Sequence, residues 1–184
     1  MPDESRMTVS AEFRTLAASS RSELERLFLR GRAPAPTALV GAPYLGWNLP
    51  GWAEVLRIRK FVKGFTVVGS GVLGHNTPVR QNGLDGDWQP LPSAATPKRF
   101  GFFGVHPADP AAARGHPDAL LLDYGVPENG RFGITRLIRD HLVAVEPGSA
   151  DLLLGRAYLA MGPRLLPVSV FLLERARPAP GAGP

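Results

Sequence analysis

The residues best suited to chemistry lie in two stretches of the last third of the chain. Arg139 and His141 flank an aspartate, and Arg156 and Tyr158 lie two residues apart in an apolar run. If both stretches are strands, Arg139 and His141 share one face, and so do Arg156 and Tyr158, because alternate side chains of a strand point the same way. Two interpretations stay open. These side chains either point into a pocket and orient a ligand, or lie on the solvent side of the sheet.

Three side chains are candidates for acid–base catalysis: His141, Asp123 and Tyr158. Asp123 follows a run of leucines, and a carboxylate at the end of a buried strand can act as a general base with a raised pKa. The alternative role of Asp123 is to cap the turn that Gly125 marks. Trp88, in a Gly/Pro-rich loop, is interpreted either as a lid over a barrel mouth or as an aromatic plug under the loop.

No phosphate loop, dinucleotide fingerprint or HExxH motif is present in the sequence. Gly69-Ser70-Gly71 lacks the glycine spacing of a nucleophile elbow. The four histidines are not spaced as metal ligands, and the absence of cysteine excludes disulfides and thiolate ligands. We therefore expect no metal site and no cofactor.

Length and composition predict a single globular domain. The chain has 184 residues, a formal net charge of +5 and only three lysines. Its arginines are dispersed, so nucleic acid is not expected as a partner. Residues 57–63 are the only basic concentration, which predicts a solvated helix or strand face. The chain starts without a signal peptide and has no apolar run long enough to span a membrane, so we expect a cytoplasmic protein with no membrane partner.

The C-terminal third predicts a β-sheet. Three apolar, β-branched runs (143–145, 152–159 and 168–173) are separated by turns at Pro147-Gly148 and Gly162-Pro163. Similar runs upstream raise the expected number of strands to seven to nine, at residues 39–47, 65–73, 77–82, 99–105 and 119–124. Residues 135–145 fit either one long strand or a helix running into a strand. Many short strands and few helices predict a sandwich or a small barrel.

One amphipathic helix is expected before the sheet. Ser20 and Glu23 have the spacing of a capping box, residues 23–30 repeat apolar side chains at helical spacing, and Gly31 suits the C-terminal cap. A second short helix is expected over residues 52–61. The resulting organisation is a flexible N-terminus (1–19), one barrel domain with its N-terminal helix (20–177) and a disordered tail (178–184).

Several short segments resemble the GXWXG proteins, a family of small lipocalin-like domains. The resembling segments are Gly41-Ala42-Pro43-Tyr44-Leu45-Gly46, with Tyr44 in place of the motif tryptophan, then Lys63-Gly64-Phe65, and the closing runs 151–160 and 168–175. The resemblance implies a lipocalin-like β-barrel with an N-terminal helix. It implies no reaction and no catalytic residue.

The sequence as a whole predicts a mainly β fold, a small antiparallel barrel that binds a hydrophobic small molecule. The expected ligand-binding side chains are aromatic or polar: Tyr44, Trp47, Trp52, Phe65, Phe102, Arg139, His141, Arg156 and Tyr158. Two alternatives stay open. One is a barrel enzyme, a cyclase, isomerase or hydrolase of secondary metabolism. The other is a ligand-free interaction module that uses its helix and the basic stretch, with a homodimer formed through a sheet edge.

Overall fold

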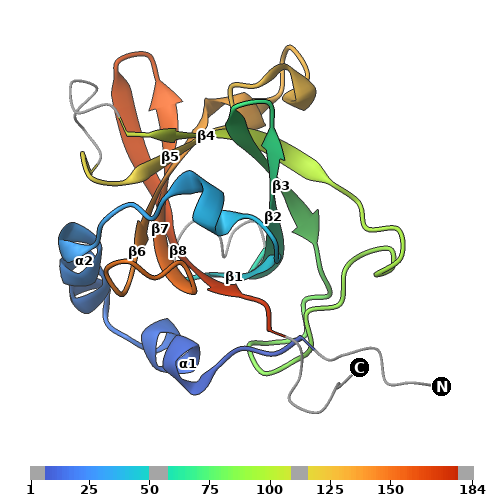
Figure 1. Cartoon of the computed structure of the whole chain (residues 1–184), viewed down its shortest axis with the longest axis vertical. Coiled ribbons are helices and arrows are strands. Elements are labelled where there is room, and N and C mark those ends of the chain that lie inside the picture. Colours follow the sequence, from blue (N-terminus) through green and yellow to red (C-terminus); the bar gives the residue numbers. More distant parts are fainter. Residues whose placement is uncertain (1–6, 50–57, 109–115, 178–184) are drawn as a thin grey trace.

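The protein is a closed antiparallel β-barrel, as the sequence predicts. The computed structural model describes residues 7–49, 58–108 and 116–177. Each strand pairs with the next along the chain, and β8 returns to pair with β1 (Figure 1). The eight strands are β1 (Tyr44–Asn48), β2 (Lys60–Val68), β3 (Gly71–Pro78), β4 (Phe100–Pro107), β5 (Leu120–Asp123), β6 (Ile138–Ala144), β7 (Leu152–Met161) and β8 (Arg164–Arg175).

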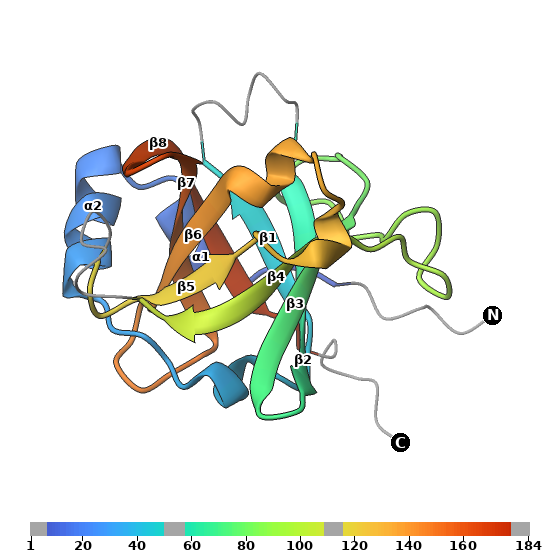
Figure 2. The ribbon, with the colours of Figure 1, turned by 90° about the horizontal axis from the view of Figure 1, so that it is seen from above.

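The two ends of the barrel are distinguished by the direction of β1. We call them the Tyr44 end, where β1 begins, and the Asn48 end, where β1 ends. Because neighbouring strands are antiparallel, β3, β5 and β7 also end at the Asn48 end. The short helices η2 (Pro127–Asn129) and η3 (Ile134–Leu137) connect β5 to β6 there, whereas η1 (Pro36–Leu39) precedes β1. The view from above in Figure 2 shows the strands crossing the barrel obliquely.

Alternation along the strands divides the apolar side chains into two clusters. One fills the barrel interior and is built from large aromatic and aliphatic groups: Leu39, Tyr44, Phe61, Phe65, Val72, Phe103, Val105, Leu120, Leu122, Tyr124, Leu142, Ala144, Leu153, Phe171 and Leu173. Glycines on neighbouring strands give the rings their space. A Cβ on Gly155 would overlap the ring of Phe171, and a Cβ on Gly46 would overlap that of Phe61.

The second cluster lies outside the barrel, between the strands and two helices. Helix α1 (Ala11–Ala17) buries Phe13, and α2 (Arg21–Arg30) buries Phe28 against outward-facing side chains such as Leu154 and Leu172 (Figure 1). The capping box at Ser20 is present, with both of its hydrogen bonds. The stretch 1–19, expected to be flexible, therefore contains a packed helix in its described part. Burial of outer strand faces makes these strands apolar on both sides.

Several element predictions need correction. The run 65–73 is not one strand, because Gly69 adopts a positive φ and turns β2 back into β3. A helix is expected over residues 52–61, but Lys60 and Phe61 belong to strand β2. The first part of that stretch, 52–57, lies outside the described residues. The ambiguous stretch 135–145 is a short 3-10 helix followed by β6.

Candidate functional site

A cluster of four polar side chains lies inside the barrel and centres on Lys63. The Lys63 Nζ donates hydrogen bonds to Asn76 Oδ1 (2.9 Å), Tyr124 Oη (2.5 Å) and Asp140 Oδ2 (3.3 Å). Strands β2, β3 and β6 and the residue after β5 each supply one member, so closure of the barrel brings them together. We call these four residues the Lys63 cluster. Three acceptors saturate the three protons of an ammonium group.

The remaining hydrogen bonds leave a single unpaired atom in the cluster. The Tyr124 hydroxyl donates to Asp140 Oδ2 (3.0 Å) and accepts from Asn76 Nδ2 (3.3 Å), which also donates to the Gly101 carbonyl (3.0 Å). Asp140 Oδ1 is buried and has no hydrogen-bond partner among the described residues. A buried acceptor without a partner is rare in folded proteins. Asp140 Oδ1 is therefore the atom of the cluster that can accept a hydrogen bond from a further donor.

Aromatic rings surround the ammonium group. The Lys63 Nζ lies 4.7 Å from the ring centroid of Phe103, 5.2 Å from that of Tyr124, and 5.4 Å from those of Phe61 and Phe171. Ring faces attract a cation, and the attraction is stronger where water is excluded. The same rings make most of the surroundings of the ammonium group apolar.

Burial sets the electrostatics of the pair. The side chains of Lys63 and Asp140 are only 3% and 4% exposed. Desolvation lowers the pKa of Lys63 and raises the pKa of Asp140, and the attraction between the two charges opposes both shifts. Burial also raises the pKa of Tyr124 well above its ordinary value, so this hydroxyl stays protonated and can donate. A lysine and a carboxylate with pKa values shifted toward neutrality mark a candidate functional site.

The wall beside Asp140 is built from small residues. In the sheet register Asp140 lies opposite Ala157 on β7, and Ala157 lies opposite Ser169 on β8. Ala157 packs on the interior cluster, and both small residues are partly exposed to solvent. By contrast, Leu122 is the β5 neighbour of Asp140 and is fully buried. The side chains beside Asp140 are therefore smaller on its β7–β8 side than on its β5 side.

Two of the predicted ligand-binding residues lie inside the barrel. Tyr44 and Phe65 pack edge to face, with ring centroids 5.4 Å apart. The Tyr44 hydroxyl donates to the Ala150 carbonyl (2.7 Å) at the Tyr44 end. Burial raises the pKa of Tyr44 to about 12. Both side chains belong to the apolar lining, and neither forms a hydrogen bond to the Lys63 cluster among the described contacts.

The polar residues on β6 and β7 come together outside the barrel. Asp140 points inward, so Arg139 and His141 point outward. The His141 and Tyr158 rings lie 5.2 Å apart, and Arg156 pairs with Glu25 of α2 (2.8 Å). Of these residues, Arg156 lies in the contact between the sheet and α2, where its guanidinium also lies 5.0 Å from the centroid of the Phe28 ring. Their predicted roles in ligand binding stay predictions.

The other predicted side chains are also placed away from the interior. Trp47 packs on the outer cluster, and Phe102 lies on the outer side of β4, where its ring is 6.3 Å from that of His75. Trp52 lies outside the described residues. Asp123 accepts a hydrogen bond from the Gly125 backbone N–H (2.6 Å), as expected if it caps the turn after β5. Its carboxylate also pairs with Arg139 (3.1 Å).

Two lysines of the basic stretch are buried, so the prediction of a solvated face is wrong for them. Besides Lys63 in the interior, Lys60 lies outside the barrel, 3.8 Å from the centroid of the Trp88 ring. The Lys60 Nζ donates to Asn82 Oδ1 (2.6 Å) and to the carbonyls of Gly86 (2.7 Å) and Asp87 (3.2 Å). Trp88 is completely buried in the outer cluster. Trp88 is therefore a plug that the lysine helps to hold.

Comparisons with models of protein families, with curated proteins and with solved structures found no match. The resemblance to the GXWXG proteins stays a prediction. Within residues 7–49, 58–108 and 116–177, no helix has the length and apolar character needed to cross a membrane. The same described residues contain no group of three or more potential metal ligands.

Sequence reasoning missed all four members of the Lys63 cluster. The available signals were weak. Lys63 stands between Phe61 and Phe65 at the spacing of one strand face, and Asp140 is a single carboxylate between Arg139 and His141. A lysine that shares a strand face with two phenylalanines is the signal that points most directly to the interior.

Acidification is expected to destabilise the protein through His141. Burial, and secondarily the charge of His116, lowers the pKa of His141 below its ordinary value of 6.5. Between the lowered pKa and 6.5 the unfolded chain binds more protons than the folded one, so the free energy of unfolding falls as pH falls through this range. His141→Gln should flatten that fall in urea unfolding between about pH 7.5 and 5.5, which brackets the ordinary histidine pKa. His106→Gln, at an exposed histidine, is the control, and an unchanged slope in His141→Gln would contradict the assignment.

Proposed function

We propose that the barrel binds a small, largely apolar molecule that donates a hydrogen bond, such as that of a hydroxyl group, to Asp140 Oδ1. The observation that carries the proposal is the unpaired state of this buried atom in a network whose other polar atoms have partners among the described residues. Leaving a buried acceptor unsatisfied costs about 1–3 kcal/mol, more for a charged group. A donor from a bound molecule would recover that energy.

The surroundings of Asp140 support a largely apolar molecule. Phe61, Phe103 and Phe171 line the interior around the cluster. On the inward face of β7 and β8, Ala157 and Ser169 are opposite one another and have small side chains. Pockets of this kind combine an apolar lining with a few polar groups that fix orientation. The aromatic rings occupy much of the interior, which favours a compact ligand over an extended one. The resemblance to lipocalin-like domains points in the same direction.

A matched pair of probes tests the hydrogen bond without any change to the protein. 2-Naphthol has a hydroxyl donor, and 2-methoxynaphthalene has a similar shape but none. Titration calorimetry on the intact chain should give 2-naphthol an affinity at least about tenfold higher, because a hydrogen bond to a charged group contributes about 1.5–3 kcal/mol. Equal affinities would refute the role of Asp140. No detectable binding of either probe would contradict the proposal that the interior binds a compact, largely apolar molecule.

The location is tested by enlarging the side chain opposite Asp140 on β7. Ala157→Leu places a larger side chain on the inward face of β7, where it should abolish binding of 2-naphthol. Ala160→Leu makes the same substitution on the outer face of the same strand, by alternation from Tyr158, and should leave binding unchanged. The two variants are compared after urea unfolding has shown that both are folded. Retained binding by folded Ala157→Leu would place the ligand elsewhere.

A further inference from the structure

Large apolar side chains gather, exposed, at the Asn48 end of the barrel. Phe132 is 95% exposed and Ile134 is 73% exposed. The group, which we call the apolar tip, comprises Phe132, Ile134, Leu137, Met161 and Leu166. Scattered single apolar residues are ordinary on a protein surface, but several large ones exposed on two loops at one end indicate an interaction site.

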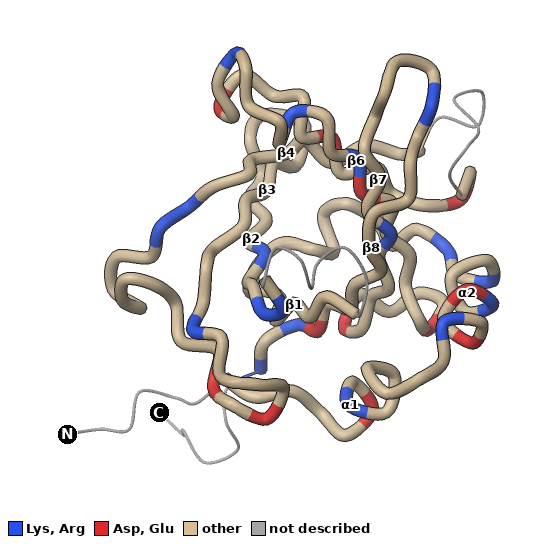
Figure 3. The backbone as a smooth tube through the Cα atoms, turned by 180° about the vertical axis from the view of Figure 1, so that it is seen from behind, with Lys and Arg blue, Asp and Glu red and all other residues tan. Residues whose placement is uncertain are grey.

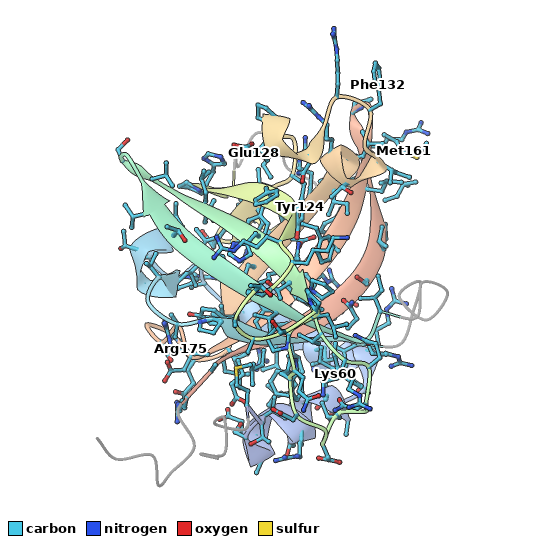
Figure 4. The ribbon with its side chains drawn as sticks, turned by 90° about the vertical axis from the view of Figure 1, so that its right-hand side faces the viewer. Lys60, Tyr124, Glu128, Phe132, Met161 and Arg175 are labelled. Carbon is cyan, nitrogen blue, oxygen red and sulfur yellow. The ribbon has the colours of Figure 1, made fainter. Side chains whose placement is uncertain are left out.

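Two connections bring the apolar tip together. Phe132, Ile134 and Leu137 lie in the β5–β6 connection and η3, and η3 packs against β7. Met161 ends β7 at the hairpin with β8, and Leu166 on β8 pairs with Leu159. Phe132 and Met161 both project outward, away from Tyr124 in the interior (Figure 4), but they belong to two separate projections, because the β5–β6 connection and the β7–β8 hairpin stand apart (Figures 1 and 3). The tip thus consists of two projecting loops at one end of the barrel, linked by the contact of η3 with β7.

Basic side chains accompany the apolar tip. Arg131 and Arg164 are both exposed. Arg131 precedes Phe132 in the sequence, and Arg164 pairs with Met161 at the start of β8. Arg136 is held within the connection by hydrogen bonds to the Gly125 carbonyl (2.9 Å) and the Gly130 carbonyl (3.4 Å). Glu128 is the acidic residue of the same connection (Figure 4). Elsewhere the charged residues are spread over the molecule (Figure 3). The tip therefore carries a local positive excess.

We propose that the apolar tip docks the protein on the surface of an anionic membrane. Apolar side chains enter the boundary between headgroups and acyl chains, while arginines at the rim contact anionic headgroups. Two projecting apolar loops, each with an exposed arginine, match both properties of that surface. Docking of two copies through this tip would bring Arg131 and Arg164 of each copy close to those of the other, and like charges oppose such contact.

This proposal goes beyond ligand binding and stands without it. It revises the expectation that no membrane is a partner, because it concerns contact with a membrane surface and not a spanning segment. Met161, a tip residue, ends β7 four residues beyond Ala157. Docking there would place the small-residue wall near the source of apolar molecules.

Vesicle co-sedimentation of the full chain tests the proposal. The vesicles contain either phosphatidylcholine alone or phosphatidylcholine mixed with phosphatidylserine. Wild type should sediment with the mixed vesicles, and Phe132→Ser/Ile134→Ser should bind at least about tenfold more weakly. Val67→Ser/Val68→Ser, at exposed apolar residues of the opposite, Tyr44 end, is the matched control and should bind as wild type does. Arg131→Gln/Arg164→Gln should reduce the preference for the mixed vesicles and its sensitivity to salt.

Three results would overturn the proposal. The first is wild type that stays in solution with the mixed vesicles, and the second is equal loss of binding in the tip and control variants. The third is a wild-type dimer in light scattering that Phe132→Ser/Ile134→Ser dissociates, because the tip would then be a contact between copies. All substitutions replace exposed side chains, and the urea midpoint of each variant establishes that it is folded.

Discussion

Replacement of Lys63 by methionine is expected to lower the free energy of unfolding by about 3–5 kcal/mol, because it leaves Asp140 buried without its cation. The hydrogen bonds from Lys63 to Asn76 Oδ1 and Tyr124 Oη are lost at the same time. Methionine keeps the length and apolar contacts of the lysine stem, so the loss reports the charge and not a cavity. Urea unfolding at neutral pH measures it.

The double variant Lys63→Met/Asp140→Leu separates the pair from its parts. Burying two charges carries a desolvation cost, and apolar replacements of similar volume are often neutral or stabilising. The double variant should therefore recover most of the stability that Lys63→Met loses. Lys98→Met, at an exposed lysine, should leave the free energy of unfolding nearly unchanged. A double variant no more stable than Lys63→Met would show that both side chains are needed for folding.

The recovery bears directly on function. If the barrel folds as well without the ion pair, stability does not explain why three strands and the residue after β5 converge on this cluster. A role in binding then accounts for the cluster. The same double variant should lose the preference for 2-naphthol over 2-methoxynaphthalene, because it lacks the Asp140 acceptor.

Local signals allowed much of the fold to be predicted. The capping box at Ser20 and the turn at Gly162, whose φ is positive, depend on a few neighbouring residues, so the helix α2 and the β7–β8 hairpin follow from the sequence. The β2–β3 hairpin was missed because Gly69-Ser70 interrupts an otherwise continuous apolar run only briefly. Barrel closure itself depends on pairing between β1 and β8, which are distant in sequence.

The candidate site could not be predicted because both faces of several strands are buried. On β6, Leu142 faces the interior and Val143 faces the outer cluster under the helices, and both are fully buried. Alternation correctly separates Asp140 from His141, but apolar content does not tell which of these faces points inward. A one-residue choice of face exchanges the two sets of side chains. The placement of α2 over the sheet, which is tertiary information, resolves that choice.

Replacement of Gly155 by alanine is the second substitution with a large expected effect, a loss of about 1–3 kcal/mol in the free energy of unfolding. Gly155 lies opposite Phe171 in the β7–β8 register, and a Cβ at this position would overlap the Phe171 ring. The ring has little freedom to move, because it is buried in the interior and packs edge to face on Phe61, with centroids 6.0 Å apart. Gly71→Ala is the control, since the nearest atom to its added Cβ is the Val68 carbonyl oxygen at 3.8 Å.

A second substitution distinguishes overlap with the ring from a general intolerance of β7. Phe171→Leu removes the ring, so Gly155→Ala should cost less stability in the Phe171→Leu background than in wild type, as a double-mutant cycle by urea unfolding would measure. Equal costs in both backgrounds would show that the ring is not the reason for the glycine. Phe171→Leu alone also enlarges the interior near the Lys63 cluster. If ligands enter there, this variant should gain affinity for probes bulkier than 2-naphthol, because the Phe171 ring then no longer limits their size.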